Sequence, residues 1–279
     1  MGLFDLFRRS APEPEPQPRR DAGYRRFERD PARSIDLAKT ASLARLFAVP
    51  GDRRDEEWVM RFWETAWTAA LAIPEPPVVT GPDGFPYLRL DLPPDGADFE
   101  ANSLMNVAPA MVEQGVGAAL FASADADVAS PEFVIPMGVL DSILRFDNPA
   151  GEPNELEEVR RGPSGPGPTT IEAGEQILIG TPSAEYLSPP AARALHRHLS
   201  EDWGLADPRV AILVVASMCP SRSLVIGQSR SALLAAGATE AQISGWMQRI
   251  GWYLPPSRGL MLMPDDWDVG SMTPLREMF

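Results

Sequence analysis

The sequence predicts an α+β (mixed α/β) fold made of two similar-sized α/β halves. Amphipathic helical stretches and short apolar runs typical of strands alternate irregularly along the chain, which is the pattern of this class. The 279 residues suffice for one large domain or two small ones, each with its own core. The 30 prolines are about twice the usual share of ~5%. Helices and strands are therefore expected to be short or interrupted.

Residues 1–33 are predicted to be a disordered tail that is basic and rich in proline. Within it, Pro12–Pro18 alternates proline with polar residues, so this stretch has no apolar surface to bury. Before it lies a short amphipathic N-terminus, in which four apolar side chains share one helical face and two arginines follow: Leu3, Phe4, Leu6, Phe7, Arg8 and Arg9. Three interpretations stay open for this segment: contact with a membrane surface, docking on a protein partner, or a frayed end.

Residues 34–146 are predicted to form the N-terminal half. Its clearest element is a helix over about 55–72, with Trp58 and Phe62 on its apolar side and Arg61 opposite. The other expected elements are, in order, a short helix ending at Pro50-Gly51, a hairpin of strands at 78–79 and 87–92 with its turn at Gly81-Pro-Asp-Gly84, a helix at 103–112, strands at 116–121 and 133–135, and a helix at 137–144.

Residues 147–174 are rich in Gly, Pro and Glu and are predicted to be a linker between the halves. Residues 175–279 then form the C-terminal half. Its best helix start is Ser188 before Pro189-Pro190, because proline in the first turn loses no needed hydrogen bond. The other expected elements are a strand at 176–180, a hairpin of strands at 210–217 and 223–226, a helix near 240–250 and a strand at 260–263.

Charge divides the chain unevenly and excludes several classes of protein. Residues 1–54 carry 12 basic and 8 acidic side chains (+4), and residues 55–279 carry 13 and 31 (−18), which sum to −14. An acidic body repels phosphates, so we expect no nucleic-acid partner.

The longest apolar run, 210–219, is about half the ~20 residues of a transmembrane helix. We expect a cytoplasmic protein, with peripheral membrane contact through the tail as an alternative.

Side chains suited to metal or nucleophilic chemistry are few. The single cysteine, Cys219, rules out a disulfide framework and lacks the anion-binding loop of a cysteine phosphatase, so we expect a small buried or half-buried residue. The only histidines, His196 and His198, lie two residues apart on a predicted helix, where their side chains project ~200° apart. We expect both on the helix surface, and we expect neither a metal nor another cofactor.

One carboxylate pair is less easily dismissed than the others. Asp265 and Asp266 follow the end of a predicted strand, where binding sites often lie. Together with Arg222 they are the candidates for an alternative function, a hydrolase or transferase that uses carboxylate and guanidinium groups. No Gly-x-Ser-x-Gly motif is present, and a serine triad would have to use one of the two histidines on the predicted helix. We assign no catalytic residue.

Aromatic residues and methionines gather in the C-terminal third of the chain. These side chains favour adaptable contacts between proteins, although packing in a core is the ordinary alternative. Pro, Asp and Gly interrupt the stretch after Pro264, which favours exposure there. The candidate protein-contact surface is Trp267, Met272 and Met278.

Two stretches resemble the bacterial SseB-like (enhanced serine sensitivity) family. In the first, Gly117-Ala-Ala-Leu-Phe-Ala-Ser123 precedes Phe133-Val-Ile-Pro-Met-Gly-Val-Leu-Asp-Ser-Ile-Leu144. In the second, Gly174-Glu-Gln-Ile-Leu-Ile-Gly180 is followed by Val210-Ala-Ile-Leu-Val-Val215 and Leu224-Val-Ile-Gly227. The resemblance covers about residues 116–250 and rests on apolar patterns. It implies a cytoplasmic two-part α/β protein and supplies no catalytic residues.

The function that the sequence predicts is non-catalytic protein binding in the cytoplasm, in an adaptor, regulatory or chaperone-like role. The prediction rests on the lack of convergent catalytic groups, the acidic body and the attached tail. The first alternative is the hydrolase or transferase described above. The second is a peripheral membrane accessory protein anchored by residues 2–9.

Overall fold

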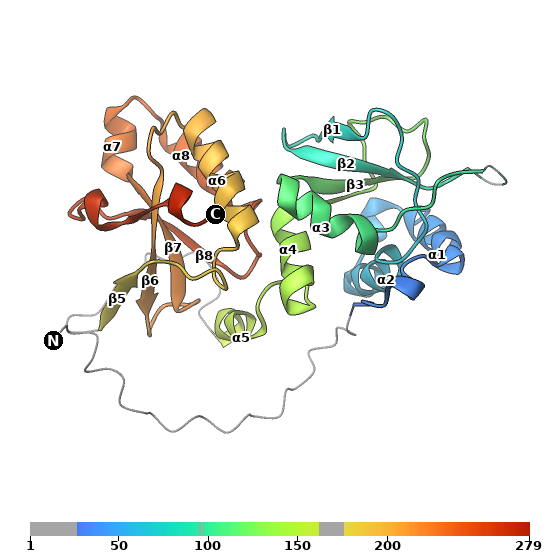
Figure 1. Ribbon diagram of the computed structural model, residues 1–279, viewed down its shortest axis with the longest axis horizontal. Helices are drawn as coiled ribbons and strands as arrows, with labels where there is room; N and C mark the ends of the chain where they lie inside the picture. The colour runs from blue at the N-terminus through green and yellow to red at the C-terminus, as the bar shows by residue number, and fades with distance from the viewer. Residues whose placement is uncertain (1–26, 95, 97, 162–175) are drawn as a thin grey trace, which may run out of the picture.

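The computed structural model describes residues 27–94, 96, 98–161 and 176–279, with no side chains described for 159–161. The chain has an α+β fold built on two mixed sheets with helices packed around them, as predicted (Figure 1). Among the described residues, no helix combines the length and the apolar character needed to cross a bilayer. The predictions for residues 1–26, including the amphipathic N-terminus, lie outside the described residues.

The first sheet has the strand order β1-β2-β3-β4. The predicted hairpin is confirmed, because β1 and β2 pair antiparallel on either side of a turn in which Gly84 N–H donates to the Gly81 carbonyl at 3.0 Å. Gly84 has φ of +85°, a conformation that glycine adopts without strain. Strands β2 and β3 are parallel, and β3 and β4 antiparallel. The strands are β1 (Val78–Thr80), β2 (Pro86–Asp91), β3 (Gly117–Phe121) and β4 (Phe133–Ile135).

Side-chain caps mark where the first helices begin. Asp36, Asp55 and Ser103 each accept a backbone N–H of the first turn. The second helix ends at Ala66 instead of 72, because the backbone beyond it pairs elsewhere: Leu71 N–H donates to the Asn102 carbonyl at 2.7 Å. The helices of this half are α1 (Leu37–Phe47), α2 (Glu56–Ala66), α3 (Leu104–Gln114) and α4 (Met137–Phe146), with short 3-10 turns at Pro31–Arg33 and Gly51–Arg53.

The second sheet has the order β5-β6-β7-β8, and the short β9 also pairs with β6. The predicted β6–β7 hairpin is confirmed. Strands β7 and β8 are parallel and are connected through α7 and α8. The strands are β5 (Ile177–Gly180), β6 (Arg209–Val215), β7 (Arg222–Ser229), β8 (Gly259–Met263) and β9 (Thr273–Pro274).

Helix α6 of this half begins at the position that the sequence predicted. Ser188 caps α6 by accepting the Ala191 N–H, and proline occupies the first turn. The α8 helix begins with a capping box, in which Thr239 and Gln242 each accept the other's backbone N–H. The helices are α6 (Pro189–Glu201), α7 (Arg230–Ala235) and α8 (Glu240–Gly251), with 3-10 turns at Val269–Ser271 and Leu275–Glu277.

Two stretches expected to be unstructured are ordered by contacts with distant residues. A helix, α5 (Pro153–Arg161), lies within the stretch predicted as a linker, and its carboxylates bind arginines of the second sheet. At the other end, Phe27 is buried and its ring packs edge-on against Trp63 and Trp67, with centroids 6.2 and 5.1 Å away. Part of the predicted tail (residues 1–33) and part of the predicted linker (residues 147–174) are therefore ordered.

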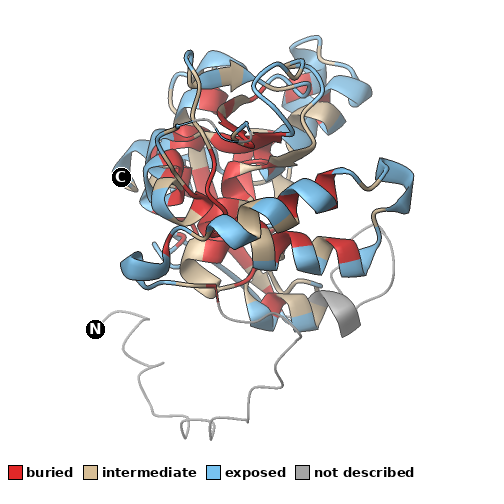
Figure 2. Cartoon of the chain, turned by 90° about the vertical axis from the view of Figure 1, so that its right-hand side faces the viewer, coloured by how far each residue is buried: buried red, intermediate tan, exposed pale blue. Residues whose placement is uncertain are grey.

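The two sheets share one hydrophobic core. Figure 2 shows the buried residues gathered inside the molecule, with exposed residues on the outward helix faces. Across the junction, Phe85 stacks on Trp252 at 4.5 Å between ring centroids, and the Trp252 indole N–H donates to the Tyr87 hydroxyl at 2.7 Å. Gly138 of α4 lies directly against the backbone of Leu254. The halves are thus packed as parts of one continuous cluster of buried side chains.

We predict opposite effects for two Gly→Ala substitutions inside helices. At Gly138 the added methyl would overlap the Leu254 backbone, so the free energy of unfolding should fall by roughly 1–3 kcal/mol. At Gly245 of α8 no atom lies within 4 Å of the new methyl, so the substitution should raise it by about 1 kcal/mol. Urea denaturation of both variants measures the difference. Equal effects of the two substitutions would contradict the tight junction.

Candidate functional site

The residues proposed for a hydrolase or transferase do not converge. Arg222 begins β7, whereas Asp265 and Asp266 follow the end of β8. Because the two strands run parallel, these positions lie at opposite ends of the sheet, separated by roughly 23 Å along the strand direction. No single substrate group can contact both.

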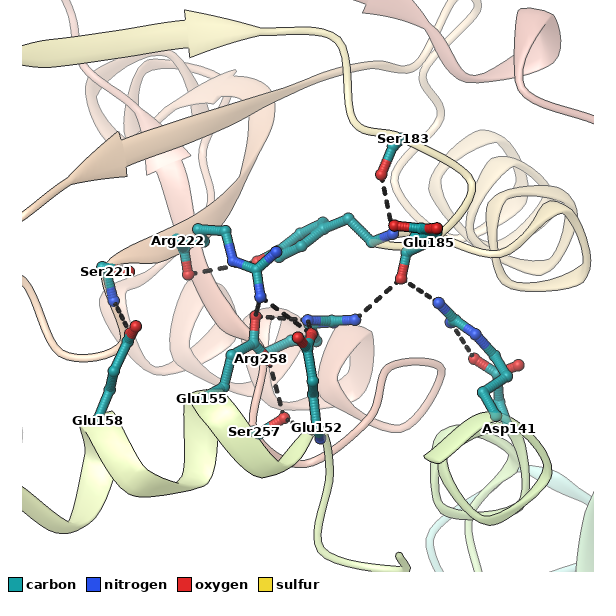
Figure 3. A network of polar contacts seen from close by, with 12 residues as sticks. Asp141, Glu152, Glu155, Glu158, Ser183, Glu185, Ser221, Arg222, Ser257 and Arg258 are labelled. Atoms are coloured by element: carbon teal, nitrogen blue, oxygen red, sulfur yellow. Dashed lines mark hydrogen bonds and ion pairs between the residues drawn. The ribbon is translucent and has the colours of Figure 1, made fainter. Parts of the chain in front are cut away.

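Arg222 instead belongs to a cluster of two arginines and two glutamates that joins α5 to the second sheet (Figure 3). Its guanidinium lies 3.0 Å from Glu152 and 3.1 Å from Glu155. Arg258 lies 2.7 Å from Glu152 and also pairs with Glu155. The side chains of Arg258 and Glu155 are wholly buried, so their charges are compensated by each other and not by water.

Further contacts surround this cluster. The Ser257 hydroxyl donates to Glu155 at 2.9 Å, and the Arg258 guanidinium lies 4.3 Å from the centre of the Tyr186 ring. Burial raises the pKa of Glu155, against the opposing effect of both arginines. Burial also acts to raise the pKa of Glu152, but Arg258 and Arg222 together outweigh it and the pKa is lowered. The cluster holds α5 in place, and its innermost members offer no surface to a substrate.

Asp265 lies beside a shallow groove at the carboxyl ends of β7 and β8. It accepts a hydrogen bond from the Ser231 hydroxyl at 2.5 Å, and Ser231 lies 3.0 Å from Ser229. The bond from Ser231, followed by that from Ser229, lowers the pKa of Asp265. A carboxylate with a lowered pKa is a weak base. The groove, of about 640 Å³, has Met247 and Met263 among its lining residues and the Arg230–Glu240 ion pair at its rim.

The histidines and the cysteine differ from expectation in burial. His196 and His198 do lie two residues apart on α6, but His198 is buried. Its Nδ1 lies 2.5 Å from the Asp202 carboxylate, which lets the ring pack inside. Cys219 is exposed, and its thiol donates to the Glu158 carbonyl. Among the described residues, no three His, Cys, Asp or Glu side chains gather closely enough to hold a metal ion.

The predicted contact residues are more buried than the sequence suggested. Met272 is only 4% exposed and packs with Ala211, Leu213 and Val225 in a second, smaller core on one face of the sheet. Trp267 is half-buried against the same core, and Met278 is half-buried against the main one. Met272 is buried because it covers the apolar face of β6 and β7. The expectation that Met272 is exposed was therefore wrong.

A run of three adjacent exposed apolar side chains lies instead on β5. Ile177, Leu178 and Ile179 are 42%, 58% and 54% exposed. Successive side chains of a strand point to opposite faces, so both faces of β5 are uncovered. One edge of β5 pairs with β6, and on its other edge no strand of the described chain pairs with it (Figure 1). The sequence predicted this strand but gave no sign of its exposure, since an apolar run normally indicates burial.

A second groove continues from the end of β5. Strands β5 and β9 lie end to end along the same edge of β6, and the hydroxyls of Thr181 and Thr273 lie 2.8 Å apart between them. The groove has a volume of about 640 Å³, and its lining includes Pro182, Met272 and Met278. Two of the three predicted contact residues therefore line it. We call the exposed strand Ile177–Gly180 and this groove together the β5 edge.

The chain was compared with protein-family models, with curated proteins and with solved structures, and none of the three comparisons gives a match.

We predict that the buried ion pairs are needed for stability. Arg258→Ala leaves Glu155 buried without its main partner, so the free energy of unfolding should fall by about 3–5 kcal/mol. Arg230→Ala removes an exposed pair with Glu240 and should change it by at most ~1 kcal/mol. Chemical denaturation at neutral pH measures both. Similar values for the two variants would mean that the buried cluster is dispensable.

We also predict that His198 makes the fold sensitive to mild acid. Burial lowers the pKa of His198, although Asp202 opposes this, so below pH ~6.5 the unfolded chain binds a proton that the folded chain does not. This contribution to stability is complete above pH ~6.5 and decreases as the pH falls. Thermal melting between about pH 7.5 and pH 5 should show a smaller loss for His198→Gln than for the wild type. His196→Gln serves as the control, and should behave as the wild type does.

Proposed function

We propose that this protein binds other proteins, and that its β5 edge receives an extended segment of a partner as an added strand. The observation that carries the proposal is the run of three exposed aliphatic side chains on an edge strand, Ile177, Leu178 and Ile179. An adaptor, regulatory or chaperone-like role is consistent with such binding.

Within the described residues, strand β5 has little of the protection that sheet edges commonly carry. Proteins commonly protect an edge strand with lysine, proline, a bulge or a covering element. Residues 177–181 contain no charged residue and no proline. Unpaired backbone groups can bond to an added strand, while pockets for its side chains supply specificity. The edge thus has the properties of a docking surface.

The magnitudes suit a modest affinity. Burying a whole Ile or Leu side chain contributes ~1.5–3 kcal/mol, so covering three half-exposed ones adds roughly 2–4 kcal/mol, besides the backbone hydrogen bonds. A segment that continues past Thr181 gains further contact in the groove beside Met272 and Met278. Methionine adapts its shape to different partners, which favours binding of more than one sequence.

The expected partner segment is extended, apolar at several positions and basic at its flanks. The basic flank follows from charge: residues 27–279 carry 19 basic and 35 acidic side chains, a net of −16. Opposite charge on the partner speeds the encounter and disfavours acidic competitors. No neighbouring charge within 177–181 interferes with the apolar contact itself.

We predict that selection from a library of short displayed peptides enriches apolar sequences with basic flanks. One enriched peptide, labelled for fluorescence anisotropy, should bind Leu178→Lys at least about ten-fold more weakly than the wild type, since the lysine opposes strand addition. Leu234→Lys places the same charge on an exposed leucine of α7 and should bind as the wild type does. Because both positions are exposed, circular dichroism should show both variants folded.

Equal affinity of the Leu178→Lys and wild-type proteins for the peptide would contradict the proposal. So would the failure of the library to yield any binder.

A further inference from the structure

We propose that the N-terminal segment, residues 3–9 of this same chain, docks on the β5 edge. The inference rests on the proposed role of that edge as a docking surface, and it names one occupant. Four observations support it: the side chains of the segment, its charge, the length of the chain that connects it to the fold, and the small area of the edge.

The side chains of the segment fit the surface. Leu3, Phe4, Leu6 and Phe7 provide large apolar groups within five positions. On the fold, the three aliphatic side chains of β5 expose about half of their surface. The groove next to them is lined in part by methionines, whose sulfur makes favourable contacts with aromatic rings. Docking would cover both sets of apolar side chains at once, which the hydrophobic effect favours.

The charges of segment and fold are opposite. The segment carries Arg8 and Arg9 against a single acidic residue, Asp5, whereas residues 27–279 carry a net charge of −16. The arginines follow the apolar positions, so they can remain in water at the rim while the apolar side chains bury. This is the basic flank that the proposed function expects of a partner.

The connecting chain is long enough. The fold holds Phe27 against Trp63 and Trp67. Phe27 lies twenty positions after Phe7, and a chain of this length spans up to roughly 66 Å when extended. The prolines between residues 12 and 18 favour extension. A folded body of about 250 residues has a radius of gyration of roughly 18 Å, so an extended link of this length spans most of the surface of the body.

Tethering makes a weak contact sufficient. Attachment through a link of this length gives the segment an effective concentration in the millimolar range. At ~1 mM, a contact with a dissociation constant of ~100 μM is about nine-tenths occupied. The surface of four edge residues is small against the ~1,200 Å² of a stable interface between two proteins, and two bodies of charge −16 repel each other. A segment of the same chain is therefore favoured over a second copy.

The experiment places a photoreactive amino acid, benzoylphenylalanine, at position 178 of the full-length protein. Irradiation followed by proteolysis and mass spectrometry should show cross-links from position 178 to residues 3–9. Substituting both Phe4→Ser and Phe7→Ser should reduce the yield several-fold. The same photoreactive group at position 234, an exposed site on α7, is the matched control and should give no such cross-link.

Mixing chains labelled with ¹⁵N and unlabelled chains distinguishes cross-links within one chain from cross-links between two copies. Cross-links within one chain join peptides of the same isotope and support the proposal. Hybrid cross-links would assign the edge to a second copy and overturn it. Absence of the cross-link would also overturn it; if the full chain then floats with anionic vesicles and a chain lacking residues 2–9 does not, the segment belongs at a membrane surface.

The same reagents separate this inference from the proposed function. Deleting residues 2–9 should increase the affinity of the library-selected peptide several-fold, because the peptide no longer competes with the segment. If the peptide binds both chains equally and position 178 gives no cross-link, the inference fails while the proposed function stands. If the cross-link forms but no peptide is selected, the docking of the segment stands and binding of a partner fails.

Discussion

Arg258 fixes the arrangement on which the rest of the structure depends. Its buried guanidinium, just before β8, pairs with Glu155 of α5 and with Glu152, which lies just before α5. Arg222, at the start of β7, pairs with Glu152 as well. A buried charge is costly unless its partner is present, so these three elements are stable only when they are assembled together. The path of the chain between the two sheets follows from this requirement, as does the position of α5 beneath the second sheet.

The junction between the sheets adds close packing to this electrostatic tie. Trp252 stacks on Phe85 and donates to Tyr87, while the Leu254 backbone lies against Gly138, a position where no side chain fits. Contacts of this kind do not slide, because protein interiors are packed at nearly crystalline density. The two α/β halves consequently share a core, whereas β5, at the edge of the second sheet, pairs on one side only among the described residues.

The uncovered edge has a physical cost that a purely structural role does not explain. Three adjacent exposed aliphatic side chains, on a strand whose outer edge pairs with no strand of the described residues, favour association with other chains. Elsewhere the protein covers comparable surface: the apolar face of β6 and β7 is closed by Trp267 and Met272. The contrast between the covered face of β6 and β7 and the exposed side chains of β5, in the same sheet, supports the view that the β5 edge is used for binding.

Local patterns in the sequence determined much of the fold. Asp55, Ser103 and Ser188 begin their helices, and Gly81–Gly84 makes its turn, because each acts on backbone groups within a few residues. The sequence did not determine what distant residues decide. The sequence of α5 resembles a polar loop because its arginine partners lie 67 or more positions away. His198 and Met272 are buried, and Ile177–Ile179 exposed, according to which elements fold over them. Burial is a property of the assembled surface, so the candidate site became visible only in the tertiary structure.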